Sequence, residues 1–141
     1  MLRAFVSFAS EDMWARDFLV RQSQFNATPW TFTDNSLRED LDDATWKKHV
    51  RRLIQNSDLL VLLIGEETHL AHGASWEVGC ARKLSLPIFG MQIRRDSPGR
   101  IPDCMRRIPV IDWDFNSISA ELDRAYAWHE EQQLRNTGTR R

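Results

Sequence analysis

The chain has 141 residues, of which 42% are hydrophobic and 28% are charged, and its formal net charge is -1. This length favours one domain, and the composition is typical of a globular protein rather than a disordered or fibrous one. A charge so close to zero gives no overall attraction to nucleic acid or to an anionic membrane. No apolar run approaches the roughly 18 residues of a membrane span, and polar residues interrupt the N-terminus too early for a secretory signal. Two cysteines, Cys80 and Cys104, are too few for a disulfide framework, which favours a reduced, cytoplasmic setting.

Five segments have the composition of strands. Residues 59–64 form the most hydrophobic run and are followed by Gly65, which predicts a strand buried on both faces, as in a parallel sheet. A proline at the start of the last segment suits an edge strand. The five predicted strands are residues 2–8, 30–33, 59–64, 87–93 and 109–111.

Helices are predicted between these strands. Ser10 followed by two acids resembles a helix start, and Trp14, Phe18 and Phe25 then share one helical face. A second helix follows from an amphipathic pattern in residues 46–54, and Asp42 and Asp43 just before it suit the helix dipole. Later helices are predicted over residues 75–84 and around residues 118–126.

The alternating order of strands and helices indicates an α/β fold. We predict a flavodoxin-like, mostly parallel sheet of about five strands with helices on both faces. Residues 34–43 and 66–74 are expected to be loops, and the basic segment 94–107 is expected to be mostly irregular. One domain should span residues 1–134, followed by a disordered polar tail over residues 135–141.

This fold also predicts where a site would lie. In open parallel sheets, ligands bind beyond the carboxyl ends of the strands where the winding direction reverses, here between the first and third strands. Segments 8–12 and 65–72 would line that crevice, and segment 34–43 could cover it as a lid. Glu77 stands in the first turn of the next helix, on the side expected to pack on the sheet. It could face the crevice, or it could simply complement the helix dipole, worth about 0.3–1 kcal/mol.

Several motifs together resemble a known family. The first group is Phe5-Val6-Ser7-Phe8, Glu11-Asp12 and the segment 32–37. The second group is Leu63-Ile64-Gly65 with Thr68, then the segments 76–81 and 87–90. In this order and spacing they resemble the TIR-like domains of the Thoeris antiphage defence system over residues 2–93. Two departures are Gly73, where many TIR domains carry tryptophan, and segment 94–107, which matches nothing in the family.

The resemblance implies a Toll/interleukin-receptor-like enzyme that cleaves the nicotinamide–ribose bond of NAD, with Glu77 as the catalytic residue. NAD would be a substrate, and no metal or other cofactor is implied. Relatives of this kind make a cyclic or conjugated ADP-ribose signal for a separate effector, and a phage component can activate them. Self-association is also possible. One carboxylate suffices for such a reaction because cationic nicotinamide leaves without a general acid and the transition state resembles an oxocarbenium ion.

Other residues of the nucleotide pocket are less constrained. Ser7, Phe8 and Asp34 belong to the two loops that the resemblance places around the nucleotide, and Ser10 belongs to the segment expected to line the crevice. Phe8 and Trp76 could stack on nicotinamide or adenine, or could be core residues. His72 and Ser75 could hydrogen-bond ribose or phosphate, or could have ordinary loop and helix-start roles. Asp34 and Glu66 are candidate neighbours of Glu77 and are more often solvated loop acids. The substrate-binding residues predicted in addition to Glu77 are Ser7, Phe8, Ser10, Asp34, His72, Ser75 and Trp76.

Other functions fit the sequence less well. Its histidines and cysteines lack the spacing of a zinc site, and there is no G-x-G-x-x-G motif. The arginines of segment 94–107 have no aromatic residues interleaved with them, so we expect a solvated loop or an oligomer contact rather than nucleic-acid binding. Two alternatives remain: a non-catalytic TIR-type interaction module, and a nucleoside deoxyribosyltransferase-like enzyme, which shares the fold class and a catalytic glutamate.

Overall fold

The computed structural model describes residues 1–25, 30–33 and 42–139. Its strands form one sheet in the order β2-β1-β3-β4-β5, with every neighbouring pair parallel. The strands are β1 (Leu2–Ser7), β2 (Trp30–Phe32), β3 (Leu59–Ile64), β4 (Ile88–Gln92) and β5 (Val110–Asp112). This is the flavodoxin-like order, so the predicted fold class is confirmed.

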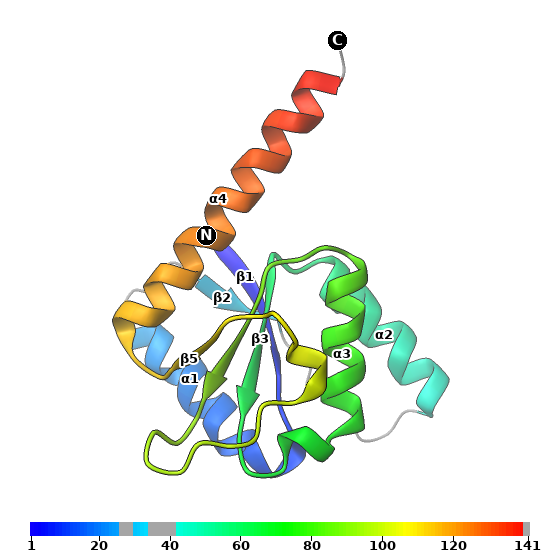
Figure 1. Cartoon of the computed structure of the whole chain (residues 1–141). Coiled ribbons are helices and arrows are strands. Elements are labelled where there is room, and N and C mark those ends of the chain that lie inside the picture. Colours follow the sequence, from blue (N-terminus) through cyan, green and yellow to red (C-terminus); the bar gives the residue numbers. More distant parts are fainter. Residues whose placement is uncertain (26–29, 34–41, 140–141) are drawn as a thin grey trace.

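Helices cover both faces of this sheet (Figure 1). One face packs against α2 (Asp43–Gln55) and α3 (His72–Lys83), and the other packs against α1 (Met13–Phe25) and α4 (Phe115–Thr139). Short 3-10 helices follow several strands: η1 (Ser10–Asp12), η2 (Thr68–Leu70) and η3 (Asp103–Met105). The carboxyl edge of the sheet is therefore bordered by η1, η2 and the chain after β4.

The central strand β3 joins the two hydrophobic layers. All of its residues are buried. Alternate side chains point to opposite faces of a strand, so successive residues of β3 belong to different layers. Leu59, Val61 and Leu63 pack with α1 and α4, whereas Leu60, Leu62 and Ile64 pack with α2 and α3. The prediction of a strand buried on both faces is confirmed.

The start of α2 is stabilised by a side-chain cap. The Asp42 carboxylate accepts a hydrogen bond from the backbone N–H of Thr45 at 2.7 Å, and this bond lowers the pKa of the carboxyl. Such a cap satisfies one of the donors that a helix start leaves unpaired. Further along the helix, Val50 and Ile54 are buried against the sheet. The amphipathic helix predicted here is confirmed.

The aromatic residues of α1 point away from the sheet. Ala15 and Leu19 are buried, whereas Trp14 is 47% exposed and Phe18 is 53% exposed. The same layer already holds the large side chain of Trp30, so smaller residues of α1 fit against the sheet. Trp14 and Phe18, two of the residues that indicated this helix in the sequence, therefore lie on its exposed face.

The last two helices are longer than expected. α3 begins at His72 rather than Ser75, and α4 continues to Thr139, into the segment expected to be disordered. Within that segment Arg135 pairs with Glu131 at 2.9 Å, an i,i+4 contact that supports helix. The distal part of α4 projects away from the sheet (Figure 1). Within the described residues, no helix combines the length and apolar character needed to cross a bilayer.

The chain after β4 folds back over the carboxyl edge of the sheet. The Gln92 side-chain amide donates to the Gly99 carbonyl at 2.9 Å, and its oxygen accepts from the Gly99 N–H at 2.8 Å. A Cβ atom on Gly99 would collide with the backbone carbonyl oxygen of Gly65. The basic segment is thus fixed at one point against the end of β3, and the fit there requires glycine.

This close approach predicts opposite effects for two glycine substitutions. Gly99→Ala should lower the free energy of unfolding by about 1–3 kcal/mol, because backbone atoms must shift to admit the methyl group. Gly79→Ala should raise it by about 0.5–1 kcal/mol, because Gly79 is helical and a Cβ there meets nothing within 4 Å. Urea denaturation of both variants measures these changes, and equal effects would contradict the proposed contact.

Candidate active site

A buried carboxylate lies beside the carboxyl end of β1. The Ser7 hydroxyl, at the last position of β1, donates a hydrogen bond to Oε1 of Glu77 at 2.7 Å. Both residues are 0% exposed. Glu77 shares the inward face of α3 with Ala74, Val78 and Ala81, so the helix carries it onto the sheet. The inward orientation expected from the sequence is confirmed.

This position is costly for an acidic side chain. Transfer of a carboxylate into an apolar layer is unfavourable unless hydrogen bonds replace the lost water. The neighbours of Glu77 on α3 belong to a hydrophobic cluster that also contains Leu62 and Ile64. The Ser7 hydroxyl is one group that compensates the carboxylate. A leucine would satisfy the packing without this cost, so Glu77 is a candidate for function rather than for stability.

A second polar cluster lies at the end of the neighbouring strand. The Thr68 hydroxyl accepts a hydrogen bond from the Gly65 N–H at 2.8 Å and lies 3.4 Å from Oδ2 of Asp12. A Cβ atom on Gly65 would collide with the Asp12 carboxylate. The sequence indicated a helix-start role for Asp12, and the signal for this second role was that Asp12 and Thr68 both belong to the motifs that resemble the family. The cluster connects η1 to η2 across the predicted crevice.

Burial raises the pKa of the Asp12 carboxyl, and the charge of Glu11 adds to this effect. The Thr68 hydroxyl and the charge of Arg94 act in the opposite direction. Because the polar cluster is nearly enclosed, Asp12 holds its proton more tightly in the folded protein than in the unfolded chain.

The other predicted site residues are dispersed. Phe8 is buried among the residues that pack with α1 and α4, on the sheet face opposite to Glu77. Ser10 is exposed and lines a pocket of about 510 Å³ with Glu67 and Leu70. His72 is at the first position of α3 and is exposed. Asp34 lies outside the described residues.

Two predicted residues of α3 face other elements. The Ser75 hydroxyl lies beside the Cys104 thiol and lowers its pKa, which burial raises more strongly. Trp76 is half-buried and packs on Trp46 of α2, with 5.4 Å between ring centroids. Arg51 lies 5.6 Å from the centroid of the Trp76 ring. Among the site residues predicted from the sequence, Ser7 and Glu77 are joined by the hydrogen bond described above.

The α2–α3 contact also accounts for one departure from the family pattern. Gly73 stands where many TIR domains carry tryptophan, and the Trp46 ring lies 3.6 Å from where a Cβ atom of Gly73 would be. An aromatic ring from α2 therefore occupies the space beside this position. The local volume is filled by a residue that is distant in the sequence.

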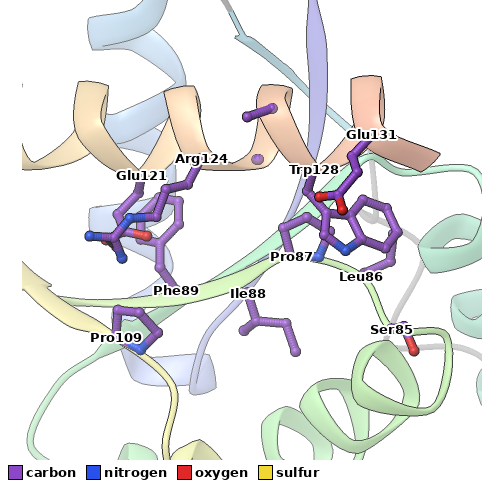
Figure 2. A pocket seen from close by; sticks show the side chains of 12 residues that line it. Ser85, Leu86, Pro87, Ile88, Phe89, Pro109, Glu121, Arg124, Trp128 and Glu131 are labelled. Atoms are coloured by element: carbon purple, nitrogen blue, oxygen red, sulfur yellow. Dashed lines mark ion pairs between the residues drawn. The ribbon is translucent and has the colours of Figure 1, made fainter. Parts of the chain in front are cut away.

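Another pocket, of about 460 Å³, lies at the opposite edge of the sheet (Figure 2). Figure 2 shows Trp128 of α4 near Pro87, and Arg124 of the same helix pairs with Glu121 at 3.3 Å. This pocket opens at the amino end of β4. Ligands of parallel sheets bind at the carboxyl ends of the strands, so we do not place the active site here.

The raised pKa of Asp12 predicts a pH-dependent stability difference. The folded state binds the proton more tightly, so the wild type should lose stability relative to Asp12→Asn as the pH rises from near 3.8 through the raised pKa. Asp114→Asn is a control of opposite sign, because hydrogen bonds from Ser117 lower the pKa of Asp114 and its charge stabilises the fold at higher pH. Urea midpoints measured from below the lowered pKa of Asp114 to above the raised pKa of Asp12 test both signs, and a difference that does not vary with pH would contradict the assignment.

Comparisons with known structures agree with this fold. The structure is similar to the crystal structure of the TIR domain of the Toll-related receptor TRR-2 from Hydra magnipapillata, with a TM-score of 0.61 and 15% identity over 96% of this chain and 99% of that chain. It is also similar to the CMP N-glycosidase BcmB from Clostridium botulinum, with a TM-score of 0.50 and 16% identity over 92% of this chain and 98% of that chain. At these identities the likenesses show the fold. A search of curated proteins found no match.

The sequence itself matches one family. The model of the family described as Thoeris protein ThsB, TIR-like domain, matches residues 5–98. The matched region runs from β1 past β4 and contains both Ser7 and Glu77. It covers more than half of the chain and confirms the resemblance found in the motifs. The chain therefore belongs to the TIR-like domain family of the Thoeris protein ThsB.

Proposed function

We propose that this TIR-like domain cleaves the nicotinamide–ribose bond of NAD, with Glu77 as its catalytic residue. The observation that carries the proposal is the Glu77 carboxylate, which lies inside the family match, is fully buried beside the carboxyl end of β1, and accepts a hydrogen bond from Ser7. Buried carboxylates with defined hydrogen bonds are concentrated at functional sites.

The chemistry requires little beyond this carboxylate. When the bond between C1′ of the ribose and the nicotinamide nitrogen breaks, its electron pair stays with the ring, which leaves as neutral nicotinamide. Positive charge develops on the ribose, and a nearby carboxylate stabilises it. Water then adds to C1′ and loses a proton, which gives ADP-ribose. A nucleophile within the same molecule gives a cyclic product when water is excluded.

Complete burial of Glu77 implies that the activity of the domain is regulated. A ribose can contact the carboxylate only after the covering residues move, so the described conformation corresponds to a resting state. We propose that a phage-derived component, with or without self-association of the domain, exposes Glu77. The product would be a cyclic or conjugated ADP-ribose that activates a separate effector. These steps would take place in the cytoplasm.

The same burial favours a second candidate, a non-catalytic TIR-type interaction module in which Glu77 has no access to substrate. A deoxyribosyltransferase-like activity is a third, because BcmB, named as a CMP N-glycosidase, has a similar fold. The NAD reaction accounts better for a carboxylate held by a hydroxyl within the matched family region.

Substitution of the carboxylate separates these candidates. Glu77→Gln should lower nicotinamide release from NAD at least about 100-fold, because the amide cannot stabilise the developing positive charge. Glu130→Gln, a change at an exposed position of α4, should retain full activity. Mass spectrometry of NAD incubated with each protein, with and without lysate of phage-infected cells, measures release. Absence of nicotinamide under every condition would exclude the enzyme, and release of cytosine from CMP instead would favour the third candidate.

Removal of the supporting hydroxyl should have a smaller and distinctive effect. Ser7→Ala should lower the rate by about 10- to 100-fold, since a hydrogen bond to a charged group contributes about 1.5–3 kcal/mol. The acidic limb of the pH–rate profile should move to higher pH, because the carboxylate loses a bond that favours its charged form. Ser57→Ala, at another buried serine, controls for a general loss of stability. An unchanged pH profile would contradict the positioning role.

A further inference from the structure

An aromatic pocket lies on the sheet face opposite to Glu77. It has a volume of about 360 Å³ and opens beside the carboxyl ends of β4 and β5. Such a volume falls within the range of small-molecule sites. The residues that line it are Trp14, Phe18, Gln22, Gln92, Ile93, Arg95 and Trp113.

The aromatic side chains that line this pocket are partly exposed, and contacts within the protein hold one of them in place. Trp14 and Phe18 of α1 are about half exposed, which is unusual for side chains of this size. The Trp113 indole N–H donates to Oε1 of Gln22 at 3.0 Å, and the Phe18 ring meets the Trp113 ring edge-on at 5.6 Å. These contacts hold Trp113 in place before any ligand arrives, which reduces the entropy that binding would lose.

Arg95 lines this pocket, and Arg94 lies against one of its aromatic residues. The guanidinium of Arg94 lies 5.2 Å from the centroid of the Trp14 ring. The Arg95 side chain is 71% exposed and lies 3.8 Å from Oδ2 of Asp114. That carboxylate already accepts two hydrogen bonds from Ser117, at 2.8 Å each. An exposed pair at this distance contributes little, so Arg95 retains donors for an anion.

The tertiary structure places aromatic residues beside these arginines, although the sequence does not. In sequence, the arginines after β4 have no aromatic residues among them. In the fold, α1 and the residue after β5 bring Trp14, Phe18 and Trp113 to Arg94 and Arg95. Flat aromatic faces with adjacent guanidinium groups are the combination that binds a base by stacking and a phosphate by charge-assisted hydrogen bonds.

We infer that this pocket binds a nucleotide, with the base on the Trp14 and Trp113 side and the phosphate at Arg94 and Arg95. The site is separate from the proposed catalytic centre. Trp113 packs with the hydrophobic cluster of α1 and α4, whereas Glu77 belongs to the layer of α2 and α3. The inference rests on the pocket's own residues and does not require NAD cleavage.

Titration of the purified full chain with AMP tests the inference, with calorimetry as the readout. Saturable binding is expected. Trp14→Ala and Arg95→Ala should each weaken it about 10-fold or more, through loss of stacking and of the phosphate contact respectively. Adenosine and inorganic phosphate, titrated separately, should each bind more weakly than AMP. Arg100→Ala and Trp128→Phe are matched controls, because neither residue lines this pocket, and both should bind like wild type.

Other outcomes would overturn the inference. Glu77→Gln should bind AMP as wild type does, so loss of binding in that variant, or retention in Trp14→Ala, would place the nucleotide elsewhere. Absence of saturable binding at millimolar AMP would exclude a nucleotide site. If sedimentation instead shows self-association that Trp14→Ala abolishes, without AMP binding, the aromatic surface is a protein interface. Circular dichroism of each variant confirms that it is folded.

Discussion

Close packing around Gly65, the residue that follows β3, determines the arrangement of the carboxyl edge. The Asp12 carboxylate lies against this glycine from η1, and Gly99 approaches its carbonyl from the chain after β4. The Thr68 hydroxyl accepts its N–H. Because β3 is the central strand and is buried on both faces, segments from several connections converge at its end. A side chain at Gly65 would push these segments apart, and the loops that border the edge would no longer pack against the end of β3.

Two different chemistries are distributed over the two faces of this edge. On the side of α2 and α3, Ser7 and Glu77 form a buried acid site inside a hydrophobic layer. On the side of α1 and α4, aromatic rings and guanidinium groups surround an open pocket. Gln92, at the end of β4, lines that pocket and also holds Gly99.

The burial of Glu77 affects both the stability of the fold and the activity proposed for the domain. In the described conformation the carboxylate is compensated by hydrogen bonding, and the surrounding apolar side chains exclude water. Exclusion of water also favours reactions in which a nucleophile within the substrate competes with hydrolysis. A carboxylate that is buried in this conformation fits production of a signal only on demand, which is the role proposed for this domain.

Hydrophobic patterning determined much of the architecture in advance. The uninterrupted apolar run of β3 specified a strand with helices on both sides, and the spacing in α2 specified its buried face. Periodicity could not decide the orientation of α1, because Trp14 and Phe18 form as regular a stripe as Ala15 and Leu19. Which stripe is buried depended on the space left beside Trp30, a residue of another strand.

The sequence by itself determined the fold class, the family and the inward direction of Glu77, because each depends on local periodicity or on motifs in fixed order. Only the tertiary structure decided the partners of these residues. Ser7 meets Glu77 across 70 positions of the chain, and Trp113 meets Gln22 across 91. Contacts at such separations depend on how the layers pack, which no local pattern encodes. For the same reason, the structure joined Ser7 to Glu77 and dispersed the other predicted site residues that it describes.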